Sequence, residues 1–271
     1  MPDSVRYRKM SARELRDSYL LNSLDAPGEM RLAYMETDRA VVGMASPMNS
    51  PLALPCDPEL RAKYFLERRE LGALNIGGAG TILVDGQLFE LNNLDCLYIG
   101  RSNQNVEFTS ADAGSPAIFY LLSYPAHADY PVTLVRKEEA NPTQLGRGEN
   151  ANLRMVCKYI HLQGARSCQL VMGVTHLSSG SVWNTMPPHT HLRRSEIYMY
   201  FNLGENDRVF HLMGAPDETR HIILGNRDIA VSPPWSIHSG AGTHAYSFCW
   251  GMGGENQDYA DMDALGVGDL L

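Results

Sequence analysis

The chain has 271 residues and a formal net charge of −8, and it has no long run of Lys or Arg, so nucleic acid is excluded as an expected partner. No apolar run approaches the roughly 18 residues that a membrane-spanning helix needs, and the first residues lack the apolar core of a signal peptide. Five scattered cysteines without a C-x-x-C pair indicate reduced thiols, so we expect a soluble cytoplasmic protein that does not contact membranes.

Turn and capping signals predict short helices followed by many strands. Ser11 and Glu14 have the spacing of a capping box, and the apolar residues that follow recur at helical intervals, which predicts an amphipathic helix. Asp57-Pro58 predicts the start of a helical turn. Residues 81–90 alternate around Asp85-Gly86 and predict a β-hairpin.

The composition along the chain predicts two domains. Residues 133–154 are polar and charged, and we interpret them as a linker between residues 1–132 and residues 155–271. Residues 258–265 are expected to form a short closing helix. Motifs recur in the same order in both halves, since Arg68-Arg69-Glu70 resembles 193–196 and 93–100 resembles 226–233, which indicates an internal duplication.

The most informative residues are three histidines and one glutamate in the second half. His189 and His191 are two positions apart, so in a strand they project from the same face. Glu196 follows after the next turn, and His238 comes from a later segment. Three imidazoles and one carboxylate form a ligand set that suits Zn, Fe, Mn, Ni or Co.

The first half lacks these ligands. Aligning Glu70 with Glu196 places Lys63 and Phe65 where the second half has its paired histidines. We therefore expect no metal site there, and we interpret the first half as structural.

The quartet and its spacing resemble the cupin superfamily, in which a strand carries His-x-His and then Glu, and a later strand supplies a third His. This resemblance implies an all-β bicupin, with two jelly-roll β-barrel domains and short flanking helices: residues 1–132 as an N-terminal barrel without metal ligands, and residues 155–271 as the metal-binding barrel. The four ligands would be His189, His191, Glu196 and His238.

Longer strings in both halves resemble the family of 5-keto-4-deoxyuronate isomerases, bacterial enzymes of pectin and uronate breakdown. They are residues 64–72, 75–81, 84–86, 183–187, 235–240 and 254–257. The resemblance implies one Zn²⁺ per subunit, a homohexamer, and a small-molecule deoxy-keto-uronate as substrate. The implied reaction is an aldehyde-to-ketone isomerisation that yields 3-deoxy-D-glycero-2,5-hexodiulosonate.

Such a reaction needs a polarised carbonyl and a group that transfers a proton between neighbouring carbons. Tyr198 shares a strand face with Glu196 and is a candidate for hydrogen bonding or proton relay, and Glu255 is the other acid–base candidate. Arg193 or Arg194 could bind the substrate carboxylate. Each of these four residues could equally have a structural role.

Two alternatives remain open from the residues. A cupin of this ligand set could be an Fe(II) oxygenase, or it could be a non-enzymatic sugar-binding protein whose metal only orders a ligand. The identity of the metal and turnover of a keto-uronate distinguish these alternatives from the isomerase.

Overall fold

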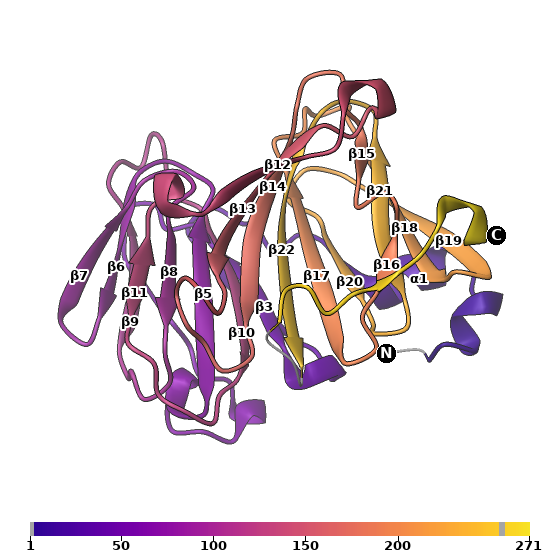
Figure 1. Ribbon diagram of the computed structural model, residues 1–271. Helices are drawn as coiled ribbons and strands as arrows, with labels where there is room; N and C mark the ends of the chain where they lie inside the picture. The colour runs from indigo at the N-terminus through magenta and orange to yellow at the C-terminus, as the bar shows by residue number, and fades with distance from the viewer. Residues whose placement is uncertain (1–2, 255–257) are drawn as a thin grey trace. The chain divides into compact units, whose positions relative to one another are not determined.

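The computed structural model describes residues 3–254 and 258–271, and β-strands make up most of its regular structure (Figure 1). The all-β class is therefore confirmed. The chain divides into two compact units. The C-terminal unit contains the residues up to Asn22 together with Asn141–Lys158 and Met172–Leu271, and the N-terminal unit contains Ser23–Ala140 and Tyr159–Val171.

The N-terminal unit consists of two antiparallel sheets. The first has the order β11 (Thr133–Val135), β8 (Cys96–Ile99), β5 (Arg69–Asn75), β10 (Phe119–Pro125), β3 (Val41–Ala45) and β2 (Met30–Tyr34). The second has the order β4 (Leu52–Ala53), β9 (Val106–Ser110), β6 (Gly80–Val84) and β7 (Gln87–Leu91).

The C-terminal unit has two larger sheets and a short strand pair. The first sheet has the order β1 (Leu20–Leu21), β20 (Ile229–Ser232), β17 (Arg194–Phe201), β22 (Ser247–Gly254), β14 (Val171–Leu177), β13 (Arg154–Ile160) and β12 (Pro142–Leu145). The second has the order β15 (Trp183–Asn184), β21 (Ile237–Gly242), β18 (Val209–Ala215) and β19 (Glu218–Leu224). The pair is β16 (His189–Thr190) with β23 (Asp263–Ala264).

The strand orders support the internal duplication. The run β8-β5-β10-β3-β2 in one unit corresponds to β20-β17-β22-β14-β13 in the other, and β4-β9-β6-β7 corresponds to β15-β21-β18-β19. In this correspondence β5, which contains Glu70, matches β17, which contains Glu196.

Hydrophobic side chains from both sheets fill the interior of the N-terminal unit. Phe65, Leu71 and Phe108 belong to one buried apolar cluster. Phe65 is the residue that aligns with His191, so an aromatic ring takes part in the core where the other unit has a candidate ligand. In the residues that the structure describes, the His189–His238 quartet is the only group of three or more potential ligands found close enough to hold a metal.

Local signals in the sequence predicted several elements correctly. Helix α1 (Ala12–Tyr19) begins with the expected capping box, in which Glu14 N–H bonds to the Ser11 hydroxyl and the Glu14 carboxylate accepts from Ser11 N–H. The hairpin of β6 and β7 turns at Asp85-Gly86, where both residues have positive φ angles of 45° and 88°. Asp57 caps a 3₁₀ turn.

The remaining helical segments are 3₁₀ turns: η1 (Arg6–Lys9), η2 (Thr37–Arg39), η3 (Pro58–Leu60), η4 (Phe65–Glu67), η5 (Lys137–Glu139), η6 (Gly148–Asn150) and η7 (Val267–Asp269). Within the described part of the chain, no helix has the length and apolar character to cross a membrane.

Two local expectations differ from the structure. Residues 258–265 do not form a helix, because Asp263–Ala264 pairs with β16 and Leu265 N–H bonds to Pro188 O at 3.1 Å. Residues 133–154, which we interpreted as a linker, contain paired strands, since β11 pairs with β8 and β12 pairs with β13.

The unit boundaries also differ from those that we predicted. The first residues of the chain belong to the C-terminal unit, because β1 pairs with β20 and Tyr7 packs on Trp235 with ring centroids 4.6 Å apart. No local signal in the sequence indicates such distant partners.

Candidate metal centre

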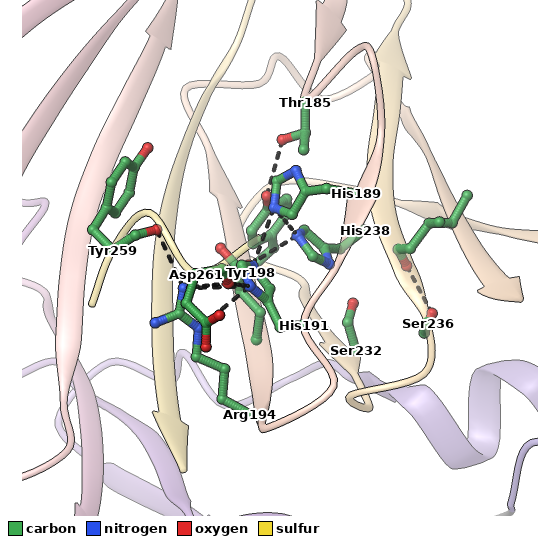
Figure 2. Close-up of polar contacts among 12 residues, drawn as sticks. Thr185, His189, His191, Arg194, Tyr198, Ser232, Ser236, His238, Tyr259 and Asp261 are labelled. Carbon is green, nitrogen blue, oxygen red and sulfur yellow. Dashed lines mark hydrogen bonds and ion pairs between the residues drawn. The ribbon is translucent and has the colours of Figure 1, made fainter. Parts of the chain in front are cut away.

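The histidine and glutamate side chains predicted as ligands converge in the C-terminal unit. His189 Nε2 lies 3.1 Å from His191 Nε2 and 2.9 Å from His238 Nε2. Glu196 Oε2 lies 3.0 Å from His191 Nε2 and 2.9 Å from His238 Nε2. Figure 2 shows the three imidazole rings facing a common point.

Separate elements position these four side chains. His189 is in β16 and His191 follows it directly, Glu196 is in β17, and His238 is in β21. Strands β17 and β21 belong to different sheets, so the quartet lies where the inner faces of both sheets meet. The ligand set therefore depends on the folded unit and not on one local segment.

The proton positions in the quartet favour a cation. His191 Nδ1 lies 2.7 Å from the carbonyl oxygen of Asp261. A carbonyl can only accept, so Nδ1 carries the proton and Nε2 presents a lone pair. That lone pair faces the Glu196 carboxylate. Two acceptors at this distance repel each other unless a positive ion lies between them, and metal bonds of about 2.0–2.2 Å allow one ion to contact both atoms. The donor set therefore fits a divalent metal.

The pKa values agree with this assignment. Burial and the neighbouring His238 lower the pKa of His189 to about 3, so its imidazole is neutral at pH 7, as a metal ligand must be. Burial opposes ionisation of Glu196, but the neighbouring His238 and His191 outweigh it and hold the pKa of this carboxyl well below its usual range. Three neutral imidazoles and one carboxylate leave a 2+ ion with a net positive charge.

A cavity of about 230 Å³ opens onto the quartet. Its walls combine metal-ligand candidates with aromatic, apolar and a few polar side chains: Leu145, Arg154, Val156, Thr175, Thr185, Pro187, His189, His191, Glu196, Tyr198, Phe248, Trp250, Met252, Tyr259 and Met262. The cavity is thus large enough for a small molecule and is partly shielded from water.

The structure places Tyr198 in the cavity wall, as its position on the Glu196 face of the strand predicts. Its hydroxyl lies 2.9 Å from the hydroxyl of Thr185, and its ring is 5.5 Å from that of His238 (Figure 2). Burial, together with the negative charge of Glu196, raises the pKa of Tyr198 well above its usual value. The hydroxyl is therefore a neutral hydrogen-bond donor.

The two arginines suggested for substrate binding have different surroundings. Arg193 is exposed. Arg194 is 1% exposed and donates to the carbonyl oxygens of Asp258, Tyr259 and Asp261, at 2.5, 3.2 and 3.2 Å. Neither contributes to the cavity wall. Arg194 thus holds the segment that in turn orients His191, and a role for either arginine in binding substrate stays a prediction.

Glu255, the second acid–base candidate, lies outside the described residues.

Two residues that line the cavity, Arg154 and Tyr259, were not predicted as site residues. Arg154 lines the cavity, although the sequence pattern assigned it to the end of the linker. Its alternation with Val156 at the start of a strand was the signal that could have revealed it. Tyr259 also reaches the cavity, from a segment expected to be helical.

The fold and the quartet define an all-β protein with a candidate metal centre beside a small-molecule cavity. The model of the KduI/IolB family matches residues 21–265. The chain therefore belongs to the KduI/IolB family.

Curated relatives cover nearly the whole chain. It is 53% identical over 256 residues to the 4-deoxy-L-threo-5-hexosulose-uronate ketol-isomerase of Lachnoclostridium phytofermentans, covering 94% of this chain and 93% of the relative. It is 48% identical over 269 residues to the protein of the same name from Halalkalibacterium halodurans, covering 99% and 97%. Ketol-isomerases are intramolecular oxidoreductases, and this is the enzyme class that the relationship supports.

A solved structure shows the same fold at much lower identity. The crystal structure of an IolB-like protein from Salmonella typhimurium superposes with a TM-score of 0.75 and 14% identity, covering 92% of this chain and 97% of the other. At this identity the likeness concerns the fold alone.

Proposed function

We propose that the protein is a zinc-dependent ketol-isomerase that converts 5-keto-4-deoxyuronate to 3-deoxy-D-glycero-2,5-hexodiulosonate in the breakdown of pectin and other uronates. The observation that carries the proposal is the His189, His191, Glu196 and His238 quartet beside a cavity, in a chain closely similar to ketol-isomerases. A cytoplasmic location is part of the proposal and agrees with five free cysteines.

The proposal includes a bicupin architecture, in which each unit is one cupin barrel. The matching strand orders of the two units support it. The N-terminal barrel would be structural, since Phe65 fills its core where the other unit has a histidine.

The four residues of the quartet would hold a divalent metal, which would act as a Lewis acid toward a carbonyl oxygen and stabilise developing negative charge. The net change moves one hydrogen from C2 to C1 of the sugar and one from the C2 hydroxyl to the C1 oxygen, so no oxidant is needed. This balance distinguishes the reaction from that of an Fe(II) oxygenase, which consumes oxygen.

The residues of the chain would bind and orient the substrate around this step. We assign to Tyr198 a hydrogen bond to the reacting oxygens, because its neutral hydroxyl lines the cavity and is oriented by Thr185. Phe248 and Trp250, on the neighbouring strand β22, also line the cavity and would limit the access of water to the reacting carbons. Glu255 is retained as the candidate for proton transfer between carbons.

The function is tested with purified protein, metal analysis and the keto-uronate. We expect about one zinc per chain, loss of isomerisation after chelation, and recovery when zinc is added back. In heavy water, deuterium should enter C1 of the product. Zinc-loaded protein that leaves the keto-uronate unchanged, while the Fe(II) form consumes oxygen, would contradict the isomerase and favour the oxygenase. Ligand binding without turnover in any metal form would favour the sugar-binding alternative.

The role of Tyr198 is tested by Tyr198→Phe, which should lower kcat by about 100-fold while zinc remains bound. Tyr200→Phe is a matched control, since Tyr200 points from the same strand but bonds to His211 Nδ1 at 2.8 Å and does not line the cavity. Equal rates for Tyr198→Phe and the wild type would remove Tyr198 from the mechanism.

A further inference from the structure

We infer that Arg154 binds the carboxylate group of the substrate and so determines which end of the molecule reaches the metal quartet. This inference rests on the proposed function, because it takes a uronate as the ligand. It assigns the carboxylate to a residue different from Arg193 and Arg194.

Among the described residues that line the cavity, Arg154 is the only Arg or Lys. It is the first residue of β13, and both it and Val156 reach the cavity, so the period-two alternation of the strand directs this guanidinium inward. The acidic residue of the same wall is Glu196, which the metal would engage. A ligand carboxylate that enters the cavity can therefore form an ion pair with the Arg154 guanidinium.

The charge of Arg154 has no counter-ion in the described part of the chain. Its hydrogen bond goes from Nη1 to the carbonyl oxygen of Asn152 at 2.9 Å, and no ion pair with a carboxylate is found. Burial lowers the pKa of this guanidinium, which still remains charged at neutral pH. A partly buried charge without a counter-ion costs free energy, and a bound carboxylate would lower that cost.

The inner face of the sheet connects Arg154 to the quartet. The strand order β17-β22-β14-β13 places Arg154 three strands from Glu196. Tyr198 is opposite Trp250 on the neighbouring strand, and Trp250 Nε1 donates to Thr175 Oγ1 at 3.1 Å on the strand after that. All of these side chains line the cavity.

This spacing suits a six-carbon acid. Three strand spacings correspond to roughly 14 Å between the backbones of β17 and β13. The long arginine side chain on one side, and the ligands with their metal on the other, take up much of that distance. An extended keto-uronate can then place its carboxylate at Arg154 and its C1 and C2 at the quartet. A neutral sugar would leave the guanidinium unpaired.

The test compares two variants and two substrates. Arg154→Gln removes the charge, and Arg154→Lys keeps it but loses the planar fork that binds a carboxylate in a bidentate way. Arg147→Gln, an exposed position in the same unit, is the matched control. The substrates are the keto-uronate and its neutral methyl ester.

We expect the wild type to prefer the acid over the ester by about 100-fold in kcat/KM, and Arg154→Gln to lose that preference. The loss should appear mainly as a higher KM for the acid, with little change for the ester. Arg154→Lys should recover part of it, and Arg147→Gln should match the wild type. An unchanged preference in Arg154→Gln overturns the inference, as does loss of zinc from that variant, because the residue would then be structural.

Binding measurements separate this inference from the proposed function. Calorimetry with chelator-treated protein reports the affinity for acid and ester without turnover. Weaker binding of the acid to Arg154→Gln than to the wild type supports the inference even if zinc-loaded wild type fails to isomerise the compound. Equal affinities overturn it even if isomerisation is observed.

Discussion

At the scale of single residues, the orientation of His191 connects the metal centre to the end of the chain. Its Nδ1–H donates to Asp261 O, and Arg194 holds the same segment through three carbonyl oxygens. Arg194 Nε and Nη2 also lie 3.4 and 3.3 Å from Nδ1, but the shorter bond to the carbonyl determines the position of the proton. Arg194 is therefore a positioning residue for a candidate ligand.

Removing one ligand should empty the metal site without unfolding the protein. In His238→Ala we expect metal affinity to fall at least about 100-fold, since even loss of a supporting hydrogen bond to a ligand typically costs 10–100-fold. The secondary structure should be retained. Elemental analysis after dialysis measures the effect, and His244→Ala, at an exposed histidine, is the control. Full zinc occupancy in His238→Ala would show that this residue is not a ligand.

A second buried histidine predicts a pH dependence of stability. Burial lowers the pKa of His211 to about 3, whereas in the unfolded chain it is about 6.5. Below pH 6.5 His211 becomes protonated in the unfolded state but stays neutral in the folded state, so the free energy of unfolding decreases as the pH falls. Between about pH 6 and pH 4 this contribution approaches 1.4 kcal/mol per pH unit.

The measurement is denaturant unfolding of chelator-treated wild type and His211→Gln over this pH range. The stability of the wild type should fall more steeply, by about 1.4 kcal/mol per pH unit, because the protonation of the other histidines is common to both proteins. Parallel slopes would mean that His211 does not titrate as described.

At the scale of elements, equivalent strands of the two units use a glutamate differently. Glu196 on β17 faces imidazoles, whereas Glu70 on β5 is fully buried and accepts from the Tyr98 hydroxyl and the N–H groups of Cys168, Gln169 and Leu170, at 2.7–2.8 Å. The carboxylate that is a candidate metal ligand in one repeat thus binds a backbone segment in the other.

Glu70→Gln should therefore destabilise the N-terminal unit by about 3 kcal/mol, since the amide has one acceptor oxygen and turns a donor toward other donors. Hydrogen exchange at residues 168–170 should accelerate, while zinc content stays the same. Glu107→Gln, at an exposed position in the same unit, provides the comparison. Unchanged exchange at these three amides would contradict the anchoring role.

At the scale of the whole molecule, the candidate metal ligands of the described residues all lie in the C-terminal unit. In the N-terminal unit, Phe65 takes part in an apolar core at the position of the second histidine, and we propose that this unit has a structural role. We propose that the subunits assemble into a homohexamer, as the family resemblance implies, because closed symmetric assembly would occupy surfaces that carry no active site.

Light scattering should then give a mass close to six chains of 30.1 kDa each at micromolar concentration. The mass should not change on removal of zinc if the quartet lies within one subunit. A monomer mass under these conditions would remove the hexamer from the proposal.

The sequence by itself determined the β-class, the capping box at Ser11, the hairpin at Asp85-Gly86 and the four candidate metal ligands. These features follow from short-range physics: side chains alternate in a strand, a serine side chain caps the first turn of a helix, and an Asp-Gly pair adopts positive φ angles. The capping box and the hairpin can each be predicted from a few consecutive residues, whereas the quartet also needs His238 from a later strand.

Only the tertiary structure decided where distant segments meet. It placed Arg154 in the cavity wall, paired residues 263–264 with the strand of His189, and joined the first residues of the chain to the C-terminal unit. Strand pairing depends on backbone hydrogen bonds that any residue except proline can make, so the pairing partners leave little trace in local sequence. The sequence did not predict Arg154 as a site residue for the same reason. Arg154 reaches the cavity only because β13 pairs into the same sheet as β17.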